Sequence, residues 1–359
     1  MAAHRENKIR LVEIIPLLLG TFGLVMVFSA SSGISVYKRT IPVSFIKQLA
    51  IFIVAVSIFF ISSKLKPKIW EKMSPVLIMI AISLLILTRF FGQEINYARR
   101  WLYIGKISFQ PSIFAQLALI TFLAKKRDFG ISVLFISLIA GLILIQPDIS
   151  MALMTVLLGI MMLFLNETKI WKVVGVAGIM LLIGGAFIAK EGYAHQRITT
   201  YLNPNSISKT VQAISNGGFS GLGLGSGMGK FFYIPFPDSD FIFSIIGEEL
   251  GFIGSLFVIS LFLIYFISAS KSSLRASNNY ASILGLGLIS FIAIYALVHI
   301  LVSLGVIPVT GVPLPFISRG GTALVIAYIA GGVIVSIEKD HSSIRRWNGG
   351  TYIPGSFHS

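Results

Sequence analysis

The fold class of this chain is decided by FGISVLFISLIAGLILI (residues 129–145), the break Gln146-Pro147-Asp148, and ISMALMTVLLGIMMLFLN (residues 149–166). Asp148 is the only charged residue in this stretch. Each apolar run approaches the roughly 20 residues with which a helix crosses about 30 Å of hydrocarbon. Proline bends or breaks a helix. The stretch therefore predicts two membrane-spanning helices, over 129–147 and 149–166.

Similar apolar runs recur along the whole chain. Of its 359 residues 55% are hydrophobic and 12% are charged, and the mean hydropathy is +0.87. A soluble domain could not hide so much apolar surface, and the short alternating segments of a membrane barrel are not visible. We expect an all-α polytopic membrane protein of about ten spans. The other spans are predicted over 11–30, 43–63, 74–91, 108–124, 170–189, 241–269, 281–305 and 313–337. The run 11–30 is long enough to remain as a first span, and no cleavable signal is evident.

The net charge of +15 is concentrated in alternate loops between these runs. This pattern is typical of cytoplasmic loops and disfavours nucleic-acid binding. It predicts that both termini are cytoplasmic and that the loops 92–107 and 190–240 are extracytoplasmic. We expect one transmembrane domain over 1–340 and a cytoplasmic tail over 341–359. The basic clusters are Arg5, Lys8 and Arg10; Lys64, Lys66, Lys68 and Lys72; Lys125, Lys126 and Arg127; Lys169 and Lys172; Lys271 and Arg275; Lys339, Arg345 and Arg346.

The long loop ends in the glycine-rich segment 216–230, whose last residue is Lys230. Glycines allow positive φ and close backbone approach, so the segment could cradle a phosphate; a re-entrant loop is the alternative. Asp240 follows, next to the predicted start of a span. It is either a helix N-cap or a carboxylate that acts as a general base. Glu248 and Glu249 lie near the hydrocarbon, where acids usually pair or line a cavity.

Cationic residues accompany this acid in the extracytoplasmic loops. Arg99, Arg100 and Trp101 could anchor the chain at the membrane interface or capture an anionic head group. Arg319 lies in the Pro/Gly-broken segment 313–321, and such breaks are tolerated where backbone lines a cavity. We expect structural roles for the lone polar residues, which are Asp148, His195, Arg197 and His299. There is no cysteine, metal-ligand spacing or nucleotide-binding loop.

Several segments, in order, resemble the SEDS family (shape, elongation, division and sporulation), typified by FtsW and RodA. They are GLVMVFSAS (23–31), RWLYIG (100–105), FQPS (109–112), QPD (146–148), NGGFSGLGLG (216–225), DFIFSIIGEELGFIG (240–254) and PVTGVPLPFIS (308–318) with Gly320-Gly321. The segment KFFYIP (230–235) looks more like the FtsW/SpoVE branch than the RodA branch. The resemblance implies a ten-span peptidoglycan glycosyltransferase of the bacterial cytoplasmic membrane. Its substrate would be lipid II, polymerised at the extracytoplasmic face, and its partner a class B penicillin-binding protein that acts as transpeptidase.

The family's essential carboxylate falls on Asp240, and its Arg-Trp pair falls on Arg100 and Trp101. The reaction would be one inverting displacement, in which Asp240 takes the proton of the attacking sugar hydroxyl. The departing pyrophosphate needs charge stabilisation, to which a divalent cation, magnesium or manganese, could contribute. The further candidates for substrate binding are Lys230, Arg197, Ser318 and Arg319.

The chain departs from the family pattern near this site. A Glu and a Lys after Gln-Pro-Ser are replaced by Ile113 and Gln116, which indicates a coordinated loss of an ion pair. A usual His, Tyr and Asn become Asp238, Arg319 and His299, and Ser150 and Met151 stand where Gly-Thr is usual. Altered donor recognition and loss of polymerase activity both remain open. Two other functions are therefore kept as hypotheses: a transporter of the lipid-linked precursor, and a non-catalytic scaffold for a transpeptidase.

Overall fold

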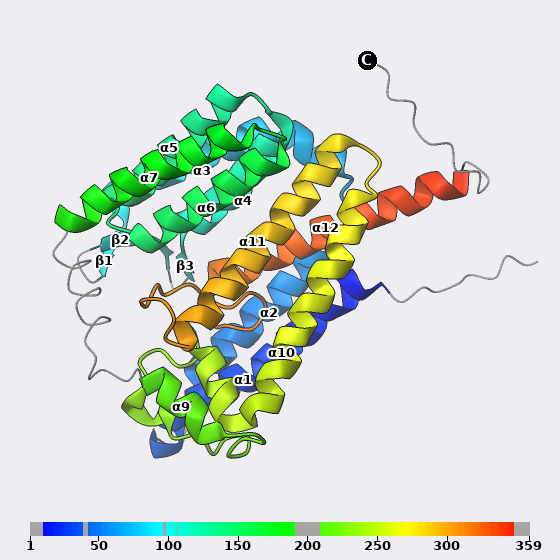
Figure 1. Ribbon diagram of the computed structural model, residues 1–359. Helices are drawn as coiled ribbons and strands as arrows, with labels where there is room; N and C mark the ends of the chain where they lie inside the picture. Colours follow the sequence, from blue (N-terminus) through cyan, green and yellow to red (C-terminus); the bar gives the residue numbers. More distant parts are fainter. Residues whose placement is uncertain (1–9, 39–41, 96–97, 106, 191–208, 348–359) are drawn as a thin grey trace, which may run out of the picture.

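The computed structural model describes residues 10–38, 42–95, 98–105, 107–190 and 209–347. The chain is mostly helical (Figure 1). Its long helices are α1 (Leu11–Lys38), α2 (Val43–Ser62), α3 (Pro67–Phe91), α4 (Pro111–Lys125), α5 (Phe129–Ile145), α6 (Ile149–Leu165), α7 (Ile170–Lys190), α10 (Ile242–Leu274), α11 (Asn279–Ser303) and α12 (Gly321–Trp347). Among the residues that the structure describes, two short helical elements precede α10, namely α9 (Lys209–Gly217) and the π-helix η1 (Gly229–Tyr233).

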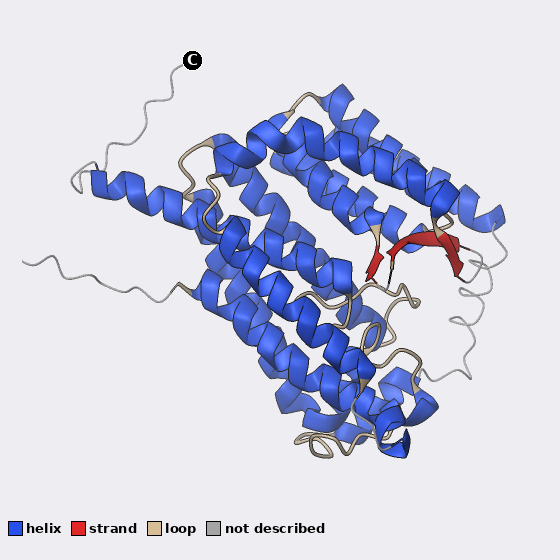
Figure 2. Cartoon of the chain, turned by 180° about the vertical axis from the view of Figure 1, so that it is seen from behind, coloured by secondary structure: helices blue, strands red, loops and turns tan. Residues whose placement is uncertain are grey.

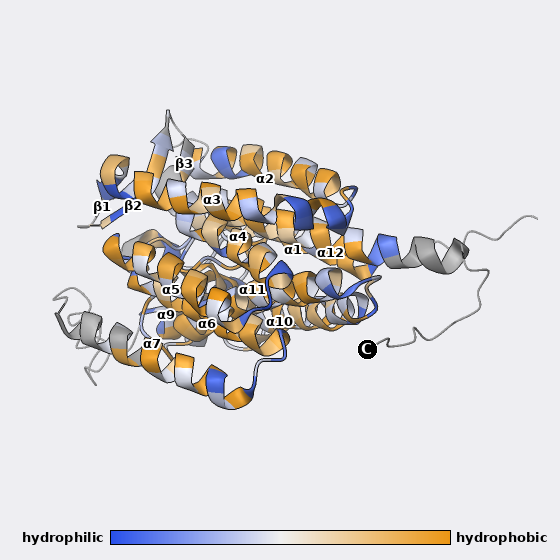
Figure 3. Cartoon of the chain, turned by 90° about the horizontal axis from the view of Figure 1, so that it is seen from above, coloured by the Kyte–Doolittle hydropathy of each residue, from blue (hydrophilic) through white to orange (hydrophobic). Residues whose placement is uncertain are grey.

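Each predicted span coincides with one of the long helices. Within the described residues, α1, α2, α3, α10, α11 and α12 contain stretches long and apolar enough to cross a membrane. The apolar helices α4 to α7 are shorter in those residues. Apolar residues dominate the helices, and polar residues gather toward helix ends (Figure 3). The chain is therefore a multi-pass membrane protein.

Local sequence explains where several helices begin. Asp128 caps α5 by accepting a hydrogen bond from the Ile131 amide at 2.9 Å, and Asn278 caps α11 in the same way through Ala281. Asp148 caps α6 after the break that separates it from α5. Pro67 and Pro111 stand in the first turns of α3 and α4, where a missing N–H costs nothing.

Three helices begin three or more residues away from the predicted starts. The last span begins at Gly321 rather than at residue 313, because Pro313 to Gly320 form a loop that bonds to the segment before α10. The third span begins at Pro67 rather than at residue 74. The fourth begins at Pro111 rather than at residue 108, since residues 107–109 form a strand.

The expectation of an all-α chain missed a small sheet in the loop between α3 and α4. Its antiparallel strands are β1 (Gln93–Ile95), β2 (Ala98–Ile104) and β3 (Ile107–Phe109), with β2 in the middle. The sheet lies at the same end of the helices as the loop before α10 and the loop between α11 and α12 (Figure 2). The candidate site residues in the described chain are gathered at this end.

Candidate active site

Asp240 lies immediately before α10, in a turn. Its amide donates to the Phe236 carbonyl at 3.1 Å. The N-cap of α10 is Phe241, whose own side chain makes no capping hydrogen bond. The N-cap alternative for Asp240 is therefore wrong, because the helix begins one residue too late. The turn leaves Asp240 half-buried just before the start of the helix.

A clamp fixes this turn to the loop between α11 and α12, residues 304–320. Arg319 forms an ion pair with Asp238 at 2.6 Å, and its amide donates to the Asp238 carbonyl at 2.8 Å. The Asp238 side chain is 8% exposed, whereas that of Arg319 is 38% exposed. In the sequence analysis both residues are named as departures from the family pattern, and the structure shows that they pair with each other. The guanidinium can thus hold the turn while part of it stays open to a ligand.

Ser318 adds a second connection between the same two segments. Its hydroxyl donates to the Ser239 carbonyl at 2.7 Å and accepts from the Leu314 amide at 2.8 Å. The Gln48 side chain of α2 donates to the Ser318 carbonyl at 3.2 Å. Ser318 is buried. We predicted that Ser318 binds substrate, but in this conformation its hydroxyl is used to join two backbone segments.

Gly311, in the same loop, faces the Asp240 carboxylate. Its φ is +68°, a conformation that side chains rarely adopt. A Cβ placed on Gly311 would lie 3.5 Å from Asp240 Oδ2. Glycine here both permits the turn of the loop and leaves the space beside the carboxylate unfilled.

Arg100 approaches this end of the molecule from β2. It donates to the Pro147 carbonyl and lies 3.7 Å from Asp148 Oδ1. The Gln110 side chain donates to Asp148 Oδ2 at 3.4 Å, and the Gln110 amide donates to the Thr322 hydroxyl at 2.9 Å. Arg100 is thereby connected to the start of α12, just beyond Arg319.

Adjacent residues of a strand point to opposite faces, which separates the three predicted residues of this loop. Arg99 pairs with Glu94 at 3.4 Å on the side away from Asp148. Trp101 is half-buried on β2. Arg100, with a side chain that is 24% exposed and a buried Nε without a partner, is the arginine aimed into the structure.

The glycine-rich segment surrounds two carboxylates of α10. The amides of Met228 and Gly229 donate to Glu248 at 2.9 to 3.1 Å, and the amide of Gly225 donates to Glu249 at 3.0 Å. A Cβ on Gly229 would lie 2.8 Å from Glu248 Oε2, so only glycine fits. The backbone amides do form an anion cradle, but the anions they hold are the chain's own glutamates.

Lys230 completes this cluster. Its ammonium lies 2.7 Å from Glu249 Oε1 and also donates to the Gly225 carbonyl and the Ser29 hydroxyl. Both charged side chains are 0% exposed. The expectation that a glutamate neutralises a buried cation is confirmed for Glu249. Because all three ammonium protons of Lys230 are engaged, the structure gives Lys230 a structural role in place of the predicted contact with substrate.

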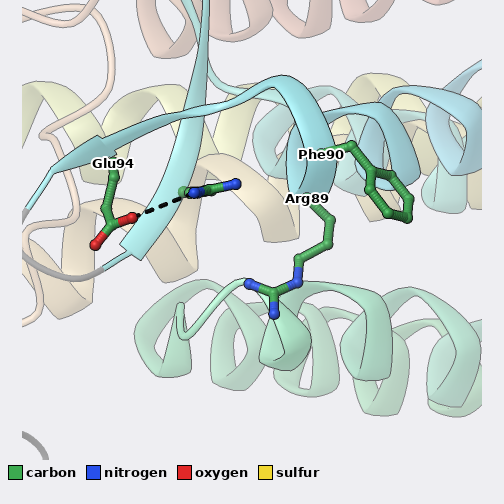
Figure 4. Close-up of a pocket in the computed structure, with 4 residues that line it drawn as sticks. Arg89, Phe90 and Glu94 are labelled. Atoms are coloured by element: carbon green, nitrogen blue, oxygen red, sulfur yellow. Dashed lines mark hydrogen bonds and ion pairs between the residues drawn. The ribbon is translucent and has the colours of Figure 1, made fainter.

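The remaining candidate features do not enlarge the site. Arg197 and His195 lie outside the described residues. Within those residues no group of three or more His, Cys, Asp or Glu side chains is arranged to hold a metal. A surface pocket is lined by Arg89, Phe90, Glu94 and Arg99 (Figure 4). None of its lining residues belongs to the Asp240 turn or to the 304–320 loop.

Comparison with known proteins shows to which family the chain belongs. The model of the FtsW/RodA/SpoVE family, described as cell cycle proteins, matches residues 9–343. The chain belongs to this family. It is 36% identical to stage V sporulation protein E of Bacillus subtilis, over 94% of this chain and 99% of that protein. It is 32% identical to the probable peptidoglycan glycosyltransferase FtsW of Trichlorobacter lovleyi, over 89% of this chain and 90% of that protein.

Solved structures show the same fold. A chain from the structure described as "structural coordination of polymerization and crosslinking by a peptidoglycan synthase complex" matches with a TM-score of 0.78 at 24% identity. The match covers 92% of this chain and 97% of that chain. Rod shape determining protein RodA of Thermus thermophilus matches with a TM-score of 0.69 at 22% identity, over 92% of this chain and 96% of that one.

The departures of this family member inside the membrane are accommodated by neutral hydrogen bonds. Gln116 donates to the Thr155 hydroxyl at 3.1 Å and to the Met151 carbonyl at 3.3 Å, and it accepts from the Tyr295 hydroxyl. Ile113, 1% exposed, is packed in the core. The hydrogen-bonded Gln116 amide and the packed Ile113 side chain stand where the family pattern has a Lys and a Glu. This fits a coordinated loss of that ion pair.

The connections at this site and the role of two supporting residues were missed in the sequence analysis. Asp238 and Arg319 were singled out separately, and their opposite charges were the signal that could have joined them. Gln48 was not singled out, and Gln110 was noted only within the segment FQPS, because a polar residue near a helix end is common. The folded chain shows that Gln48 bonds to the Ser318 carbonyl and that Gln110 bonds to Asp148 and Thr322.

Proposed function

We propose that this chain is a peptidoglycan glycosyltransferase that polymerises lipid II at the extracytoplasmic face of the bacterial cytoplasmic membrane. The observation that carries the proposal is the placement of Asp240. A half-buried carboxylate stands on a turn clamped by Asp238 and Arg319, next to the space that Gly311 leaves open. Relatives at 30 to 32% identity are named probable peptidoglycan glycosyltransferases, which supports the reaction class.

In the proposed reaction the 4-hydroxyl of the acceptor sugar attacks the anomeric carbon of the donor. Asp240 accepts the hydroxyl proton as the new glycosidic bond forms. The bond from the anomeric carbon to pyrophosphate breaks, and the α-linked donor becomes a β-linked glycan by inversion. The lipid pyrophosphate leaves as an anion, so its charge has to be stabilised.

Arg319 and Arg100 are the described cations best placed for that stabilisation. Arg319 keeps part of its guanidinium exposed while it pairs with Asp238. Arg100 carries one unpaired N–H and is partly exposed. Trp101 follows Arg100 on β2 and points to the opposite face of the strand, so it remains a proposed contact for another part of the lipid-linked substrate. Arg197 remains a proposed contact outside the described residues. A magnesium or manganese ion would be held mainly by the pyrophosphate itself.

The proposal includes a topology and a partner. We propose ten spans with both termini in the cytoplasm. The basic clusters and the presence of a helix at each predicted span support this topology. A class B penicillin-binding protein would cross-link the glycan. The matched fold occurs in a structure described as a peptidoglycan synthase complex, which supports this partner. A transporter is less well supported, since Glu248 and Glu249 are occupied by the loop amides and Lys230.

The experiment follows glycan chains made from labelled lipid II by purified protein, with and without a class B penicillin-binding protein. Asp240→Asn keeps the shape of the side chain but cannot take a proton, so we expect activity to fall by at least about 100-fold. The matched control is Asp128→Asn, because asparagine caps α5 as well as aspartate does. Full activity of a folded Asp240→Asn variant would refute the assignment of the base. An inactive wild type that still binds the transpeptidase would favour the scaffold.

A further inference from the structure

His299 lies near the end of α11 and is connected to the loop that faces Asp240. Its Nδ1 lies 2.8 Å from the Val312 carbonyl oxygen. A carbonyl can only accept, so Nδ1 carries the proton and donates it. Val312 follows Gly311, the residue beside Asp240 Oδ2. One hydrogen bond from a buried ring therefore fixes the backbone that forms one wall of the proposed site.

The surroundings of the ring indicate what its two nitrogens do. His299 is 1% exposed, and its Nε2 has no hydrogen-bond partner among the described residues. The His299 backbone carbonyl accepts from Ser303 at 2.9 Å, a bond that does not depend on the side chain. The described side-chain contact of His299 to the loop is thus made by Nδ1 alone.

This bond supports a part of the loop that the clamp does not reach. Ser318 and Arg319 hold the end of the loop next to α12. The stretch from Leu304 to Val312 contains two glycines with positive φ, Gly305 and Gly311. Because glycine restricts φ and ψ very little, this stretch needs contacts with the rest of the protein to hold one conformation.

We propose that His299 is a positioning residue that holds Val312, and with it Gly311, at a fixed distance from the Asp240 carboxylate. The expected effect on kcat rests on the proposed function, whereas the anchoring of the loop by His299 does not. His299 does not touch the reacting groups in this account. Its role is exerted through the Nδ1–H donor, and Nε2 is dispensable.

Two substitutions separate the ring nitrogens. His299→Asn places an amide N–H where Nδ1 stands and removes Nε2. His299→Gln extends an amide toward the position of Nε2 and leaves nothing at Nδ1. We expect the Asn variant to keep wild-type kcat, KM and pH profile. The Gln variant should lose kcat by on the order of 10-fold to 100-fold, the scale of a misplacement of about 1 Å, with KM little changed.

A second readout needs no activity. Hydrogen exchange in peptides over 304–313 should be as slow in the Asn variant as in wild type and faster in the Gln variant. Size-exclusion chromatography and thermal unfolding check that both variants fold. Equal exchange and equal kcat in wild type and the Gln variant would overturn the proposal. So would an Asn variant that loses kcat with unchanged exchange, since the essential atom would then be Nε2.

The same data separate this proposal from the proposed function. If the wild type makes no glycan but the Gln variant loosens 304–313, His299 anchors the loop and the polymerase assignment fails. If the wild type is active and depends on Asp240 while neither His299 variant differs from it, only the positioning role fails.

Discussion

Removal of the Arg319 guanidinium should loosen the Asp240 turn more than removal of the Asp238 carboxylate. The reason is the unequal exposure of the two side chains, 38% for Arg319 and 8% for Asp238. Arg319→Gln leaves a nearly buried carboxylate without its cation. Asp238→Asn leaves a guanidinium that water can still reach. The double variant removes both charges, so neither is left uncompensated.

The structure sets the size of the difference. A buried charged group that loses its partner costs about 1–3 kcal/mol, and the exposure of Arg319 keeps the loss below the roughly 3–5 kcal/mol of a fully buried pair. Asp238→Asn should cost about 0–1 kcal/mol, as for exposed pairs. Since about 1.4 kcal/mol is a factor of ten, local opening should increase roughly 5-fold to 150-fold in Arg319→Gln. It should change by less than roughly 5-fold in Asp238→Asn.

Hydrogen exchange measures this directly, because the Arg319 amide donates to the Asp238 carbonyl. Exchange in peptides that contain residue 319, and in peptides over 236–241, is compared for both single variants and the double variant. Peptides from the turn near Asn278, between α10 and α11, serve as an internal control. The double variant should exchange like Asp238→Asn.

Two results would contradict this account. Equal exchange in both single variants would show that the cost of losing either partner does not depend on how deeply the remaining charge is buried. A double variant as loose as Arg319→Gln would show that Arg319 holds the loop by other contacts. Glycan polymerisation by the same variants tests separately whether Arg319 also stabilises the pyrophosphate. If Arg319 also stabilises pyrophosphate, the double variant regains the slow exchange but not the activity.

Two other predictions concern glycine and charge at the same end of the molecule. Gly311→Ala should lower kcat with the fold retained, because the methyl group enters the space beside Asp240 Oδ2 and φ is +68°. Gly105→Ala carries a similar backbone cost at φ +62° with nothing within 4 Å, so equal kcat losses would refute the role of position 311. Lys230→Met should reduce folded yield on size-exclusion chromatography, since an unpaired buried Glu249 costs about 3–5 kcal/mol. Adding Glu249→Gln should restore most of that yield, and no recovery would mean that the ion pair is not what holds the loop.

The glycine-rich segment illustrates why a motif can mislead when it is considered alone. A run of glycines that exposes backbone amides is suited to any anion of the right size. In this chain the anions are Glu249 and Glu248, which lie 24 and 19 residues after the Gly225 and Gly229 amides that bind them. The same chemistry that would bind a phosphate thus fastens the long loop to α10.

The sequence alone determined the helical framework. Hydropathy, proline positions and basic clusters predicted ten helices, and the structure has a helix at each predicted span. This succeeds because an isolated backbone in hydrocarbon must satisfy its own hydrogen bonds, so an apolar run of sufficient length has few alternatives to a helix. Motif order likewise identified the family and Asp240 as the candidate base.

Only the tertiary structure decided how that base is held. Each of the bonds that matter here joins residues from two different segments of the chain. They are the ion pair of Asp238 with Arg319, the hydrogen bond of His299 with Val312, and the ion pair of Lys230 with Glu249. Secondary-structure propensity does not predict such bonds, because they depend on which loops come together once the helices have packed. The small sheet of β1, β2 and β3 was missed for a related reason. Two of its three strands have only three residues, too few to show a period, and the sheet forms only by pairing between strands.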